Sequence, residues 1–158
     1  MLKNLSKFLL LFLTGYCVYI AIEVSFRGYS YVLMGLVGGI CVLLINPIND
    51  HISWDMPLVL QMSVSAIIIS VLEVIAGKFA LHILDVRMWD YSNMWGNAFE
   101  ALFCPLFAVA WFFLSGVAIV LCDAINYYVL HEEIRPYYRL WNWNGKKHFL
   151  PERMCKNE

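Results

Sequence analysis

The chain has 158 residues, of which 61% are hydrophobic and 15% are charged, and its formal net charge is −1. Soluble globular proteins carry about 45–50% apolar and about 25% charged residues, and a small soluble fold cannot hide so much apolar surface. The composition also excludes a disordered chain, which needs low hydrophobicity and few aromatic residues. We therefore predict an integral membrane protein.

Four apolar stretches predict four membrane-spanning helices that form an all-α bundle over residues 1–126. A helix needs about 20 residues to cross the hydrocarbon core of a bilayer. The third and fourth stretches are long enough alone, whereas the first and second need flanking residues. The predicted spans are about residues 6–25, 29–46, 57–79 and 101–122.

The first stretch has a cleaved signal peptide as its alternative interpretation, because Lys3 and Lys7 precede an apolar run. No small-x-small cleavage site follows, since the next residues are Gly15-Tyr16-Cys17. We therefore expect a retained helix. Glu23 ends it, and Arg27 lies four residues later on the same helical face. Glu23 is either a polar element of a pathway or a structural residue near the interface.

The second stretch carries three closely spaced glycines, Gly35, Gly38 and Gly39. Small residues let a neighbouring helix backbone approach closely in a membrane. Glycine is also more frequent in membrane helices in general, so both interpretations stay open.

The third stretch contains the most informative residue, Glu73, about two thirds along its length. An ionisable side chain at the bilayer centre costs roughly 2.5–3.5 kcal/mol on insertion scales, so it should face the bundle interior or water. Two roles fit this position. Glu73 is either part of a substrate pathway or a hydrogen-bonded residue that serves helix packing.

The loop before the fourth stretch holds the densest group of polar and aromatic residues in the chain. Short Asp, Ser and Asn side chains favour turns, and Trp and Tyr favour the membrane interface. We predict a compact extracellular hairpin or a re-entrant element, in which Arg87 forms a partly desolvated pair with Asp85 or Asp90. Both an interface turn and a substrate-facing surface fit. The predicted site residues here are Arg87, Trp89, Asp90, Tyr91, Ser92 and Asn97.

Residues 127–158 are predicted to form a basic, aromatic tail at the membrane interface. An even number of spans and the positive-inside rule place both termini in the cytoplasm, at the plasma membrane. Aromatic and basic residues also bind single-stranded nucleic acid by stacking, but a position directly behind a span favours lipid, and we expect no nucleic-acid partner. Eight of the 11 basic residues lie at the chain's two ends: Lys3, Lys7, Arg135, Arg139, Lys146, Lys147, Arg153 and Lys156.

Several catalytic and cofactor motifs are absent from the sequence. There is no Gly-x-x-x-x-Gly-Lys-Ser/Thr phosphate loop, no His-Glu-x-x-His zinc pair and no Cys-x-x-Cys. Four of the five cysteines fall in or at the ends of predicted spans, where cysteine acts as a small apolar residue. We predict no enzyme activity, no cofactor and no metal site.

Three segments resemble a known bacterial family: Leu72–Lys78, Leu84–Asn93 and Cys104–Trp111. They are similar to the putative ABC-transporter type IV family of small multi-span membrane proteins. The resemblance covers about residues 15–115, and its matching positions are Glu73, Gly77, Trp89, Asp90, Tyr91, Ser92, Asn97 and Trp111. It implies a permease-like transporter subunit. Four spans are few for a pore, so we expect the chain to form a homo-oligomer or to join a separate ATPase or other membrane subunit. The alternative is a non-transporting scaffold or regulatory partner.

Overall fold

The computed structural model describes residues 2–48, 56–132, 134–141 and 145–152. Two of the tail's basic residues, Arg153 and Lys156, therefore lie outside the described residues. The described parts contain four α-helices and one π-helical turn, which confirms the predicted all-α membrane fold. These elements are α1 (Leu2–Arg27), α2 (Val32–Ile45), α4 (Leu58–Ile83), α5 (Pro105–Ala124) and the π-helical turn η1 (Ile125–Val129).

Three of these helices, α1, α4 and α5, are long and apolar enough to cross a membrane. Helix α2 has only 14 residues, about 21 Å at 1.5 Å per residue, which is less than the hydrocarbon core of about 30 Å. It starts three residues after the start of the predicted span because Tyr31 is extended and the Ser30 hydroxyl donates to Glu23. A full crossing by α2 stays a prediction.

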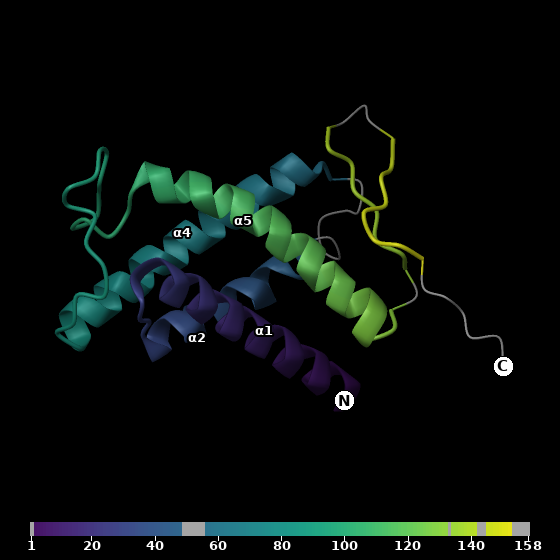
Figure 1. Cartoon of the computed structure of the whole chain (residues 1–158), viewed down its shortest axis with the longest axis horizontal. Helices are drawn as coiled ribbons and strands as arrows, with labels where there is room; N and C mark the ends of the chain where they lie inside the picture. The colour runs from purple at the N-terminus through teal and green to yellow at the C-terminus, as the bar shows by residue number, and fades with distance from the viewer. Residues whose placement is uncertain (1, 49–55, 133, 142–144, 153–158) are drawn as a thin grey trace.

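Successive helices run in opposite directions, so the molecule has two distinct ends (Figure 1). The last turn of α1 and the loop 84–104 lie at one end, which we call the loop end. The start of α1 and the C-terminal segment lie at the other, the tail end, where Lys7 Nζ pairs with Glu132 Oε1 at 2.5 Å. The start of α1 and the described part of the C-terminal segment therefore share one end of the molecule, and the even number of spans stays a prediction. The cytoplasmic location of the two termini also stays a prediction.

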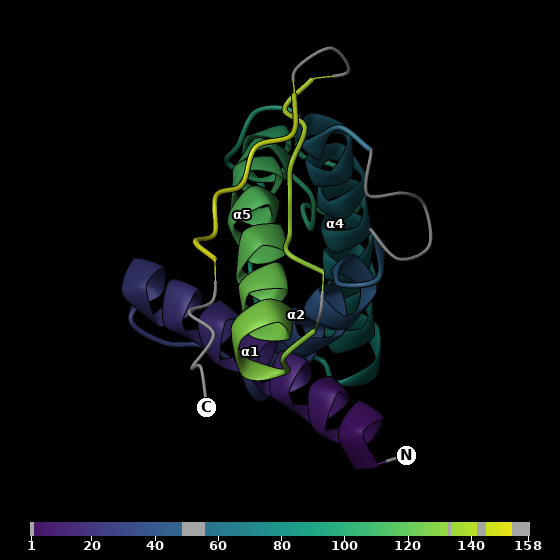
Figure 2. The same ribbon diagram turned by 90° about the vertical axis from the view of Figure 1, so that its right-hand side faces the viewer.

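Helix α1 runs obliquely to α4 and α5 and packs chiefly on α2 (Figure 2). A Cβ atom built on Gly15 would lie 2.5 Å from the Gly38 carbonyl oxygen, so only glycines allow the two backbones this approach. Gly35 and Gly39 lie against the rings of Tyr16 and Phe12 in the same way. Of the two interpretations left open for these glycines, the structure shows the close approach of a neighbouring helix.

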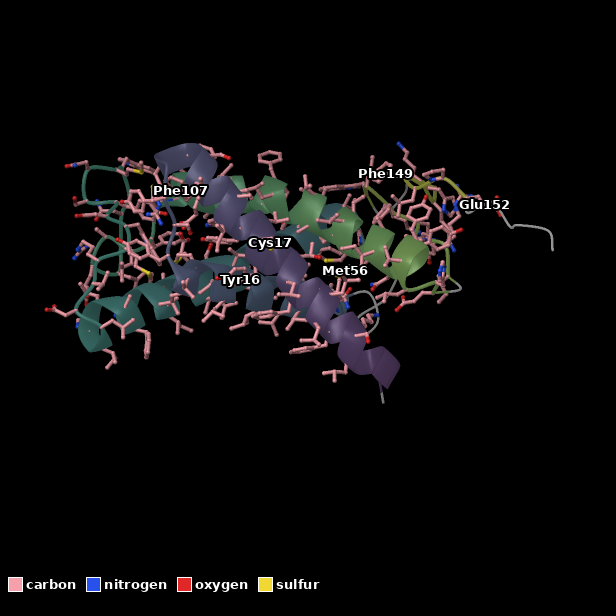
Figure 3. The ribbon with its side chains drawn as sticks, turned by 60° about the horizontal axis from the view of Figure 1, so that its bottom comes forward. Tyr16, Cys17, Met56, Phe107, Phe149 and Glu152 are labelled. Atoms are coloured by element: carbon pink, nitrogen blue, oxygen red, sulfur yellow. The ribbon has the colours of Figure 1, made fainter. Side chains whose placement is uncertain are left out.

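The C-terminal segment folds back onto the tail end of the bundle. Tyr138 is 1% exposed, and its hydroxyl donates to Asp123 Oδ2 of α5 at 2.7 Å. Burial, together with the nearby Asp123 charge, raises the pKa of the Tyr138 phenol. The backbone N–H of Leu58 donates to the Arg139 carbonyl, and Phe149, labelled in Figure 3, stacks on the Tyr138 ring. Part of the predicted interfacial tail therefore caps the start of α4 and the end of α5.

Candidate functional site

Glu73 points into the bundle, as its cost in a membrane predicts, and its side chain is only 4% exposed. Its oxygens accept hydrogen bonds from two different elements. Trp111 Nε1 of α5 donates to Oε2 at 2.9 Å, and the Tyr91 hydroxyl from the loop donates to Oε1 at 3.1 Å. Both donors are neutral, so the carboxyl group is bound by hydrogen bonds and by no ion pair among the described residues.

Glu73 opens onto a cavity of about 260 Å³ at the loop end, which we call the Glu73 cavity. Two stacked ring pairs form part of its wall: Tyr19 on Trp111 with centroids 5.6 Å apart, and Tyr91 on Phe107 at 4.7 Å. Phe107 is labelled at the loop end in Figure 3. The cavity is lined by Tyr19, Ile22, Glu23, Phe26, Arg27, Glu73, Trp89, Tyr91, Phe107, Ala110, Trp111 and Leu114.

Glu23 lies on the same cavity as Glu73 but has a charged partner. The Arg27 guanidinium donates to Glu23 Oε2 at 2.8 Å, as their four-residue spacing predicts, and the Ser30 hydroxyl donates to the same oxygen at 2.6 Å. Arg27 Nη1 also donates to the Met88 carbonyl at 2.7 Å. This arrangement ties the last turn of α1 to the loop and leaves the cavity with two carboxyl groups and one guanidinium.

Trp89 and Tyr91 both turn inward from the loop. The Trp89 ring lies against Gly77 of α4, where an added Cβ would come within 2.9 Å of it, and its indole N–H donates to the Leu102 carbonyl at 3.1 Å. The Tyr91 ring reaches Glu73. Burial and the neighbouring Glu73 raise the pKa of the Tyr91 phenol. Trp89 and Tyr91 therefore form the loop side of the Glu73 cavity.

The loop contains one strained turn, in which Phe99, Glu100 and Ala101 all have left-handed backbones with φ of 53°, 62° and 61°. Such a conformation costs a non-glycine residue about 1–2 kcal/mol. The carbonyl oxygens of residues 100, 101 and 102 accept hydrogen bonds from residues 87–91, which precede them in the loop. Their donors are the Arg87 guanidinium, the Tyr91 backbone N–H and the Trp89 indole. The Trp-Asp-Tyr segment thus holds a turn that has no glycine of its own.

Four predicted site residues are not brought into the cavity. The Ser92 backbone N–H donates to Asp90 Oδ1 at 2.8 Å, which lowers the pKa of that carboxyl group. Asn97 Nδ2 donates to the Ser92 and Met94 carbonyls and fixes the loop shape. Arg87 does pair with Asp90, at 3.7 Å, but the side chains are 40% and 48% exposed. This ion pair is solvated, which corrects the expectation of a partly desolvated one.

The cavity wall also contains three aromatic residues that were not among the predicted site residues: Tyr19, Phe107 and Trp111. Trp111 was one of the positions in the family resemblance, and a carboxyl group buried in a neighbouring helix calls for N–H donors of this kind. Tyr19 and Phe107 have no local signal, because their inward direction depends on how α1 and α5 are rotated. Among the described residues, no three His, Cys, Asp or Glu side chains gather to hold a metal ion.

The chain matches the model of a known protein family. The model described as putative ABC-transporter type IV matches residues 8–143, which include every residue that lines the Glu73 cavity. No curated protein and no solved structure matches the chain.

Proposed function

Because the chain belongs to the putative ABC-transporter type IV family, we propose that it is a permease-like membrane subunit of an ABC-type transporter. The Glu73 cavity is the observation that carries this proposal. Ionisable residues inside membrane helices are expensive and commonly line substrate or ion pathways. Here the carboxyl group faces a cavity walled by aromatic rings from α1, α5 and the loop.

The proposed subunit needs partners. Its sequence has no phosphate-binding loop, so ATP hydrolysis would belong to a separate ATPase subunit, and we assign no catalysis to this chain. The described residues provide three helices long enough to cross a membrane. So few helices would enclose a pathway only in a homo-oligomer or with another membrane subunit. We place this assembly in the plasma membrane, with both termini in the cytoplasm.

Affinity purification from native membranes in mild detergent tests the proposal. The expected result is a fixed-ratio complex with a protein that carries a phosphate-binding loop. The Glu73→Gln variant should purify with the same partner, because Glu73 lies far from the tail end, where a cytoplasmic ATPase would bind. The variant should lose transport, because the substitution changes the proposed pathway. Purification of the chain with a single fixed partner that lacks a nucleotide-binding motif would contradict the proposal.

The second candidate function is a non-transporting scaffold or regulatory subunit. One observation favours it: the next cavity toward the tail end, of about 150 Å³, is lined almost entirely by apolar side chains. A polar substrate path from Glu73 therefore does not continue through this apolar cavity. The same purification separates the two candidates by the identity of the partner.

A further inference from the structure

The Glu73 cavity and the apolar cavity lie next to each other, and we call the pair the groove. They share four lining residues, Tyr19, Ile22, Trp111 and Leu114. The apolar cavity lies between α1, α2 and α5 and follows α5 from Trp111 to Cys122, about 16 Å at 1.5 Å per residue. It exists because α1 packs chiefly on α2, while α5 packs chiefly on α4. The groove thus has a polar end at Glu73 and a long apolar end.

The polar end has more carboxyl groups than cationic groups, with Glu23 and Glu73 against Arg27. An ionised carboxyl group has about four lone-pair sites, and the described donors to Glu73 are one indole N–H and one hydroxyl. The only guanidinium that lines the cavity, that of Arg27, already binds Glu23 and the Met88 carbonyl. A buried charge is stabilised by a partner of opposite sign. A ligand that brings a positive charge to Glu73 would supply what the described residues do not.

The aromatic wall favours the same kind of group independently of the carboxyl groups. Aromatic rings attract an ammonium group over their faces, most strongly Trp and Tyr. Four of the six aromatic rings that line the cavity are of these two types, and the full set is Tyr19, Phe26, Trp89, Tyr91, Phe107 and Trp111. The carboxyl groups and the aromatic rings therefore favour a ligand with a cationic head group. The apolar cavity favours a ligand that also has a hydrocarbon chain.

We propose that the groove binds an amphiphile with an ammonium head and a single apolar chain. The head lies beside Glu73 among the aromatic rings, and the chain follows α5 through the apolar cavity. This inference rests on the proposed function, because it names the ligand class of the same cavity.

Binding of radiolabelled dodecyltrimethylammonium to the purified full chain in mild detergent tests this inference. Saturable binding is expected, with competition by unlabelled dodecyltrimethylammonium. Dodecyl sulfate, with the same chain and the opposite charge, should not compete at equal concentration. Tetramethylammonium, which has the head without the chain, should compete only at much higher concentration. These three comparisons use the wild-type protein, so they do not depend on the folding of any variant.

Two variants locate the ligand within the groove. Glu73→Gln keeps the side-chain shape and should weaken binding at least about tenfold, as expected for the loss of one charge-assisted contact. Ala118→Phe fills the apolar cavity and should weaken dodecyltrimethylammonium binding while leaving the weak tetramethylammonium binding unchanged. Glu100→Gln is the matched control, because Glu100 is a loop carboxylate that faces His82 and Lys78 outside the cavity.

The outcomes separate this inference from the proposed function. Equal binding of the cationic and anionic probes, or equal binding by the wild type and a folded Glu73→Gln variant, would overturn the inference even if an ATPase partner is found. Selective, Glu73-dependent binding supports the inference even if the chain purifies without an ATPase.

Discussion

Trp111 of α5 donates its indole N–H to the Glu73 carboxyl group of α4 at 2.9 Å, in the buried contact between these two helices. The bond fixes the rotation of both helices about their axes, since both side chains must point at the same spot. It also holds Glu73 at the edge of the cavity. Helix packing and site geometry therefore depend on the same pair of residues.

Trp111→Phe should lower the free energy of unfolding by about 1–3 kcal/mol, because a buried carboxyl oxygen loses its donor. The substitution keeps an aromatic ring at this position, which limits the change in packing. Thermal unfolding in detergent measures the change. Trp95→Phe is the control, since Trp95 is 88% exposed and its replacement should leave the melting temperature unchanged. A Trp111→Phe variant as stable as the wild type would show that the indole bond adds nothing to packing.

Glu73→Gln should leave the protein folded and inserted but impair transport. The glutamine amide oxygen can still accept from the Trp111 indole, and the Tyr91 hydroxyl can turn to accept from the amide N–H, so both contacts keep their partners. Only the charge is removed. Growth of a gene-deletion strain that carries the variant measures function, with membrane content measured in parallel. Full growth would show that ionisation at this position is dispensable.

The sequence was sufficient for the fold class and for the direction of Glu73. Long apolar runs have few alternatives to membrane helices, and a carboxyl group in such a run is costly against lipid. The glycines of α2 were also informative, because they allow the close contact with α1. These features depend on local composition, which a sequence displays directly.

The rest depends on contacts between distant segments. Nothing near Phe99–Ala101 signals a left-handed turn, because none of its residues is glycine, and the turn is held by donors from residues 87–91. The docking of Tyr138 on Asp123 likewise joins the C-terminal segment to α5. The late start of α2 likewise goes with the extended backbone of Tyr31 and the bond between Ser30 and Glu23. Single-sequence patterns do not encode such pairings.

Gly77→Ala should destabilise the protein by about 1–3 kcal/mol, the usual range for overpacking. The new Cβ would lie 2.9 Å from the Trp89 ring and 3.0 Å from Leu102, and Trp89 is held in place by its indole bond. Gly116→Ala is the matched control on α5. Its Cβ would meet only the flexible end of Met62, so its melting temperature should stay close to that of the wild type.

Ala101→Gly should stabilise the protein by about 1 kcal/mol, because glycine adopts a left-handed backbone without the steric cost that alanine has. Ala101 has a φ of 61°. The same substitution at Ala124, which has a helical φ of −63°, should instead destabilise by about 1 kcal/mol. Opposite signs for the two substitutions are the required result, measured by thermal unfolding. A loss of stability at both positions would contradict the assigned strain.

Tyr138→Phe should release the C-terminal segment, because it removes the buried hydroxyl bond to Asp123. Faster proteolysis between residues 136 and 150 is expected, and the free energy of unfolding should fall by about 1–2 kcal/mol.

The Tyr138 pKa is raised in the folded state, so this tyrosine adds stability below the ordinary tyrosine pKa of about 10. That contribution falls as the pH rises above this value. Tyr138→Phe should therefore show less alkaline destabilisation than the wild type, whereas Tyr29→Phe, at a half-exposed ring, should match the wild type throughout.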